Sequence, residues 1–168
     1  MEEHGHARTV FVALLIVALA ALPVSGVLML PDPVASSFGT DGAPEGFMPR
    51  AGYLLLMTML ATLLPPLLVG GVGWQIRHAP GSLKMPKRAH WLAPERRAAS
   101  AAWIGTHMMR FGSGLIVFMA FTQGLVLRAN LRQPPHLELV PMLVGVGLFI
   151  AFTLLWVRAL YARFAKPR

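Results

Sequence analysis

The stretch LVPMLVGVGLFIAFTLLWV, residues 139–157, contains no charged side chain between Glu138 and Arg158. At about 1.5 Å per residue, a helix of this length reaches across nearly all of the roughly 30 Å hydrocarbon core of a bilayer. Three further stretches have the same character, residues 9–31, 51–76 and 98–127, and only the last contains a charge, Arg110. The sequence therefore predicts an all-α integral membrane protein with four transmembrane helices in a single membrane domain.

The composition agrees with this fold class. Hydrophobic residues make up 55% of the 168-residue chain and charged residues only 13%, whereas soluble domains usually carry about 25% charge. This excludes an ordinary soluble domain and also disorder, which requires low hydrophobicity. Cysteine is absent, so disulfides, thiolate metal sites and thiol catalysis are excluded as well.

The first apolar stretch has a second interpretation, a cleaved signal peptide. Such signals begin with basic residues and have an apolar core of about 7–15 residues. Here Glu2 and Glu3 stand at the start, and the apolar run over 9–31 is longer. We therefore expect a retained transmembrane helix.

The third helix is expected to be longer than the membrane is thick. Pro94 and Glu95 suit the first turn of a helix, and residues 94–127 would measure about 51 Å at 1.5 Å per residue. We predict that this helix extends into the cytoplasm. Its exposed start joins a basic loop, residues 77–97, in which Trp91, Glu95, Arg96 and Arg97 are candidates for a cytoplasmic contact.

The cations indicate the orientation. With four spans, one side holds eleven of the 15 cationic residues: Arg8, Arg77, Lys84, Lys87, Arg88, Arg96, Arg97, Arg158, Arg163, Lys166 and Arg168. The other side holds Arg50, Arg128 and Arg132. Cytoplasmic loops carry the excess of Lys and Arg, so we predict a multi-pass protein of the inner (plasma) membrane with both termini in the cytoplasm. The high sequence pI of about 11.4 is then explained by cations on the cytoplasmic side that contact membrane lipid. No nucleic-acid partner is expected.

Residues 32–50 form the predicted external loop. It is dense in proline and glycine, and Asp41-Gly42 is a strong turn signal, so we expect a compact loop. Asp32, Asp41 and Glu45 are oxygen ligands of the kind that Ca²⁺ prefers, but their spacing matches no dedicated binding loop. We therefore predict no metal site and no cofactor.

The same loop carries a family resemblance. The order of residues is Leu30-Pro31-Asp32, Val34, Phe38, Gly42, Glu45-Gly46-Phe47 and Arg50. It resembles a bacterial membrane family without an assigned biochemical function, best known from the N-terminal part of the toxin-immunity protein SdpI. Residues 91–97, WLAPERR, are similar to a stretch in small four-helix relatives. The chain departs from the family pattern at Ala35, where the family has proline, and at Ser37, where it has histidine.

What the resemblance implies is a small polytopic membrane protein with a role in toxin protection or signalling. We expect a non-enzymatic binding, immunity or envelope-signalling role, or support of a partner membrane complex. The candidate external recognition residues are Asp32, Phe38, Asp41, Glu45, Phe47 and Arg50. A protein partner or a homo-oligomer would fit this role.

A polar face on the third helix supports an alternative, a small transporter or channel subunit. Trp103, His107 and Arg110 recur at steps of three and four, which places them on one helix face, and Gln123 lies further along. No apolar stretch contains an acid, which argues against a proton-coupled pump. We expect the Arg110 side chain to extend to the cytoplasmic surface. An interior Arg110 would instead need backbone carbonyls, Thr58, Thr62, a lipid phosphate, or Glu95 and another chain as partners. A third hypothesis is an enzyme acting on lipids.

Overall fold

Four long helices dominate the computed structural model, which describes residues 2–79, 81 and 87–165. They are α1 (Glu2–Met29), α2 (Arg50–His78), α4 (Pro94–Asn130) and α5 (Leu139–Ala165), and a short α3 (Arg88–Trp91) precedes α4. All four long helices have the length and apolar composition needed to cross a membrane. The predicted all-α class with four transmembrane helices is confirmed, and the chain is a multi-pass membrane protein.

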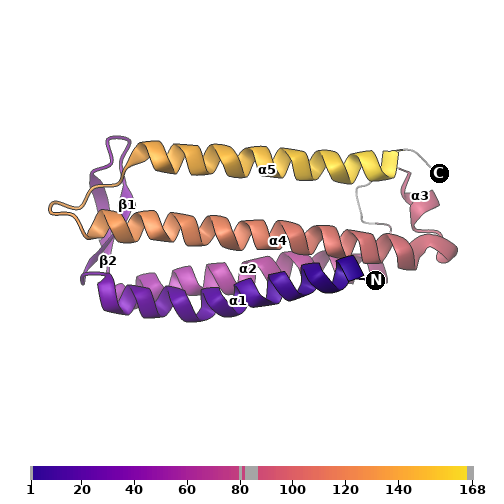
Figure 1. The fold of residues 1–168 in the computed structure, drawn as a ribbon, viewed down its shortest axis with the longest axis horizontal. Coiled ribbons are helices and arrows are strands. Elements are labelled where there is room, and N and C mark those ends of the chain that lie inside the picture. The colour runs from indigo at the N-terminus through magenta and orange to yellow at the C-terminus, as the bar shows by residue number, and fades with distance from the viewer. Residues whose placement is uncertain (1, 80, 82–86, 166–168) are drawn as a thin grey trace.

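Helix α4 is the central element of the bundle (Figure 1). It packs against α1 and α2, which also contact each other, while α5 packs mainly on α4 alone. The helix begins at Pro94 with Glu95 in its first turn, as predicted. Its 37 residues measure about 55 Å, which exceeds the thickness of a hydrocarbon core.

Three apolar clusters form the core along the bundle axis. In the central cluster, Phe11 of α1 and Ala61 of α2 meet Met109 and Ile116 of α4. Gly112 permits this close approach, because a Cβ at that position would lie 2.6 Å from the Phe11 ring. The outer surface of the helices is also apolar, as expected for side chains that face lipid tails; Ile16, Leu55 and Leu148, for example, are exposed.

The segment between α1 and α2 is a β-hairpin, an element that the prediction of a compact loop did not include. Strand β1 (Val34–Phe38) pairs antiparallel with β2 (Pro44–Met48). The Asp41 carboxylate accepts a hydrogen bond from the backbone N–H of Ala43 at 3.0 Å, and Gly42 adopts a φ of 82°, which glycine tolerates without strain. The segment is therefore compact, as predicted, and it packs across the ends of the helices (Figure 1).

The two ends of the bundle differ, and we name them the hairpin end and the basic end. The hairpin end holds β1, β2 and the α4–α5 connection, where the Gly42 carbonyl accepts a bond from the Leu137 N–H at 2.9 Å. The basic end holds the start of α1 and the end of α5 (Figure 1). Part of the predicted basic loop, residues 80 and 82–86, and the C-terminal residues 166–168 lie outside the described residues.

Candidate functional site

Three of the four residues of the predicted polar face lie together, and the fourth, Gln123, lies apart from them. Trp103, His107 and Arg110 lie together near the basic end of α4. Gln123 lies 13 positions after Arg110, about 20 Å along the helix at 1.5 Å per residue. Its side chain accepts a hydrogen bond from the Tyr53 hydroxyl at 2.6 Å. Since both side chains are buried, Gln123 belongs to the helix packing near the hairpin end.

His107 is held between two tryptophan rings. Its ring stacks on Trp103 with a centroid distance of 4.6 Å and on Trp156 of α5 with 4.8 Å. The Trp156 indole N–H donates to the His107 backbone carbonyl at 2.9 Å, and His107 Nε2 lies 3.0 Å from the Trp156 carbonyl oxygen. Because that oxygen can only accept, Nε2 must carry the proton. This reciprocal arrangement joins α5 to α4, and Trp156 is a partner that the sequence analysis missed.

Arg110 forms an ion pair with Glu3 of α1. This acid is not among the partners expected for an interior Arg110, which were backbone carbonyls, Thr58, Thr62, a lipid phosphate, or Glu95 and another chain. The acid was overlooked because the first span was predicted to begin at residue 9, whereas α1 begins at Glu2. The two side chains are 52% and 74% exposed, respectively, so the pair lies at the surface of the bundle.

These residues line a pocket of about 370 Å³ between α1 and α4, which we call the α1–α4 pocket. On its α1 side, His4 Nδ1 lies 2.7 Å from the Thr106 hydroxyl. Its lining consists of Glu3, His4, Ala102, Trp103, Thr106, His107 and Arg110. A carboxylate, a guanidinium and two imidazoles therefore converge there beside an indole ring, a set suited to a small charged or zwitterionic group.

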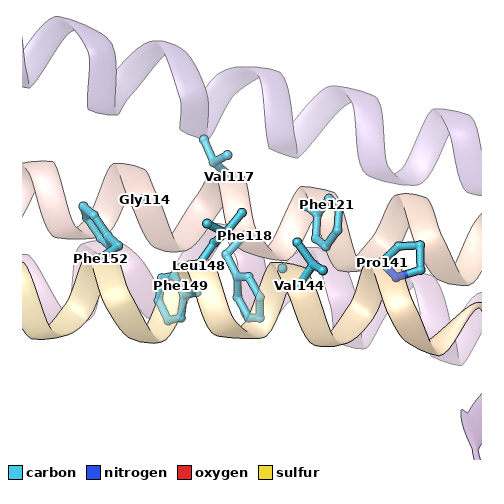
Figure 2. Close-up of a pocket in the computed structure, with 10 residues that line it drawn as sticks. Gly114, Val117, Phe118, Phe121, Pro141, Val144, Leu148, Phe149 and Phe152 are labelled. Atoms are coloured by element: carbon cyan, nitrogen blue, oxygen red, sulfur yellow. The ribbon is translucent and has the colours of Figure 1, made fainter.

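A second cavity, about 470 Å³, lies between α4 and α5 nearer the hairpin end. Figure 2 shows Phe118, Phe121, Phe149 and Phe152 around this apolar groove. The Phe118 and Phe149 rings stack with a centroid distance of 4.4 Å. The groove has the chemistry of hydrocarbon and suits lipid tails or an apolar helix surface.

The hairpin is fastened to the helices by Asn130, which the sequence analysis did not single out. The Asn130 side chain accepts a bond from the Ala35 N–H at 2.8 Å and donates to the Ala35 carbonyl at 3.0 Å. It also donates to the Val126 carbonyl at 2.9 Å. The amide thus pairs with the free edge of β1 as a neighbouring strand would. A polar residue at the end of an apolar helix, beside a turn, was the signal available in the sequence.

Two predicted recognition residues, Asp32 and Arg50, bind the polypeptide backbone instead. The Arg50 guanidinium donates to the carbonyls of Leu30 and Val27 at 3.1 and 3.3 Å, near the end of α1. Asp32 accepts from the Arg50 N–H at 3.1 Å, at the start of α2. A cation at a helix C-terminus and an anion at an N-terminus both stabilise the helices, so these two residues stabilise the end of α1 and the start of α2.

Phe38, Glu45 and Phe47 take different positions on the hairpin. Phe38 is partly buried against the apolar cluster formed by Leu30 and Val34 with α2 and α4. Glu45 and Phe47 are both exposed on β2. Phe47 is 56% exposed, so this strand presents an exposed aromatic and an exposed carboxylate.

The four residues predicted to form a cytoplasmic contact do not form one surface, because one of them is buried and three are exposed. Trp91 is only 6% exposed; its indole N–H donates to the Phe164 carbonyl at 3.0 Å, and Arg163 lies over its ring at 4.9 Å. Trp91 therefore belongs to the core that binds the end of α5. Glu95, Arg96 and Arg97 are exposed at the start of α4, where Arg97 donates to the Leu92 carbonyl at 3.3 Å and Arg96 lies 3.3 Å from the His90 ring nitrogen.

Within the described ranges, no three His, Cys, Asp or Glu side chains are grouped so that they could hold a metal ion. Comparisons of the chain with protein-family models, with curated proteins and with solved structures found no match.

Proposed function

We propose that the chain is a non-enzymatic protein of the bacterial inner membrane that binds a partner protein through its external hairpin. The resemblance to the SdpI-like family suggests the setting, immunity or envelope signalling. The observation that carries the proposal is the attachment of the hairpin, because a surface held in one conformation loses little conformational freedom when it binds.

That attachment has three independent parts. Asn130 holds the edge of β1, Arg50 and Asp32 join the hairpin's flanks to the ends of α1 and α2, and the Gly42 carbonyl binds the α4–α5 connection. On the surface fixed in this way, Phe47 supplies an exposed aromatic with Glu45 beside it. Aromatic residues are enriched at the centres of protein interfaces.

The distribution of cations supports the orientation. Among the described residues, Arg77, Arg96, Arg97, Arg158 and Arg163 belong to the basic end, which the positive-inside rule assigns to the cytoplasm. The hairpin then faces outward, where a toxin or an envelope protein would meet it. The exposed Glu95, Arg96 and Arg97 would provide a separate cytoplasmic contact.

A transport role has less support. Its predicted polar face would have to line a path along α4, but His107 is enclosed by two tryptophan rings and Gln123 is bound to Tyr53. About 20 Å of helix separates Gln123 from Arg110. A water-filled route along this face would require both arrangements to break.

The test is site-specific photo-crosslinking in native membranes. A crosslinking residue at position 47 should capture a defined partner. The same residue at position 131 should not, because Leu131 is similarly exposed, at 55%, but lies off the hairpin. Glu45→Gln combined with Phe47→Ala should abolish the crosslink at a neighbouring hairpin position, whereas Leu131→Ala should preserve it.

Equal capture from positions 47 and 131 would contradict the proposal. So would reconstituted vesicles that transport a solute and lose this activity with His107→Ala and Arg110→Ala but keep it with the hairpin variant. That result would favour the transporter instead.

A further inference from the structure

The depth of the Glu3–Arg110 ion pair in the membrane can be estimated from the length of α4. Arg110 precedes Asn130, the last residue of α4, by 20 positions, or about 30 Å at 1.5 Å per residue, which equals the thickness of a hydrocarbon core. Glu3 is at the same level because the two side chains are in contact. With the hairpin end at one surface of this core, the ion pair falls at the other, among the phospholipid headgroups.

The pair is accessible from two sides. The α1–α4 pocket borders the pair on one side, and a separate, smaller cavity of about 210 Å³, lined also by His6, Ala7, Val10 and Ser113, borders it on another. An exposed ion pair contributes little to stability, since water already solvates both groups well. A ligand with charges of both signs can therefore replace each partner at small cost.

The free hydrogen-bonding capacity of the pair defines such a ligand. A guanidinium carries five N–H donors in a planar fork that matches the oxygens of a phosphate, and the bond to Glu3 uses only Nη2 of Arg110. The Glu3 carboxylate retains acceptor sites for an ammonium. Trp103 and His107, locked in their stack, give the pocket a rigid wall.

We propose that the α1–α4 pocket binds the headgroup of phosphatidylethanolamine, with the phosphate on Arg110 and the primary ammonium on Glu3. The four charges then alternate in sign, and each ligand charge meets its opposite on the protein. Phosphatidylglycerol presents the phosphate without the ammonium, so the Glu3 carboxylate would lie beside an anion with no compensating charge. The pocket should therefore distinguish the two lipids.

The test uses the full-length protein in nanodiscs made from equal amounts of phosphatidylethanolamine and phosphatidylglycerol, with retained lipids counted by native mass spectrometry. The wild-type protein should retain phosphatidylethanolamine in about tenfold preference, the effect expected of one hydrogen bond between charged groups. Arg110→Gln should reduce the retention of both lipids.

The decisive variant is Glu3→Gln, which keeps the phosphate site and removes the ammonium site. It should lose the preference while retaining phosphatidylglycerol at least as strongly as the wild type does, which a misfolded protein without the phosphate site would not do. The matched control is Arg158→Gln, because this residue is exposed at the basic end but does not line the pocket. This variant should behave as the wild type does.

Equal retention of both lipids by the wild type, or an unchanged preference in Glu3→Gln, would overturn the proposal. Glycerophosphoethanolamine, the same headgroup without acyl chains, distinguishes a lipid from a soluble ligand. It should displace the lipid only at much higher concentration, because it lacks the membrane's local supply and the contacts of the tails. Displacement at concentrations equal to that of the lipid would assign the pocket to a soluble compound and overturn the lipid assignment.

Discussion

Replacing Asn130 by alanine should release the hairpin while leaving the helices in place. The change removes the acceptor for the Ala35 N–H and the donor to the Ala35 carbonyl, and Ala35 is fully buried. A buried polar group without a partner costs about 1–3 kcal/mol. Two such groups would cost about 2–6 kcal/mol together, and we expect a value in the lower half of this range, about 3 kcal/mol, because water at the membrane surface can reach an opened strand.

Helix propensity offsets little of this loss. Alanine is a better helix former than asparagine by at most about 0.7 kcal/mol, and Asn130 is the last residue of α4. A local destabilisation of about 3 kcal/mol corresponds to a roughly hundredfold increase in the population of the open hairpin. Hydrogen–deuterium exchange of peptides covering residues 33–48 measures that population directly.

A matched control is Thr122→Ala. The Thr122 hydroxyl is partly buried in the same helix and donates only to the Met119 carbonyl within it. Its loss should leave exchange in the hairpin unchanged. If Asn130→Ala also leaves that exchange unchanged while the protein keeps its helical content, then the side-chain amide does not hold β1 and the argument for a rigid recognition surface fails.

Three further changes test the helix packing, each through thermal unfolding in detergent. Gly145→Ala places a Cβ against the Phe121 ring and should destabilise the protein by about 1–3 kcal/mol, whereas Gly147→Ala, which meets open space, should stabilise it by about 0.5–1 kcal/mol. The same sign for both variants would refute the close α4–α5 contact. Tyr53→Phe should cost about 1–3 kcal/mol, because it leaves the buried Gln123 oxygen unpaired, and an unchanged melting temperature would show that this bond is not made.

The elements that could be predicted from the sequence are those set by local chemistry. The four helices follow from apolar stretches between charges, and the start of α4 follows from Pro94 and Glu95. The strands could not be predicted because each has five residues and becomes stable only when Asn130, 95 positions away from Ala35, supplies an edge partner. Hairpins this small are marginal without such support.

The candidate site also combines features that could be predicted from local sequence with features that could not. Periodicity within one helix correctly grouped Trp103, His107 and Arg110, because that grouping depends only on helix geometry. Their partners Glu3 and Trp156 come from other helices, and which residues meet depends on how far each helix is shifted along its neighbour. No pattern within a single segment of the sequence records that shift.

The peripheral position of α5 has a consequence for how the molecule is made. Helices α1, α2 and α4 leave the ribosome before α5, and they already hold the central apolar cluster and the support of the hairpin among themselves. Helix α5 then joins through the surface of α4, mostly by ring contacts such as those of Trp156 and Phe149. Assembly can therefore proceed in two stages, and a chain divided within the connection at residues 133–136 should regain its complete form when both pieces are expressed together.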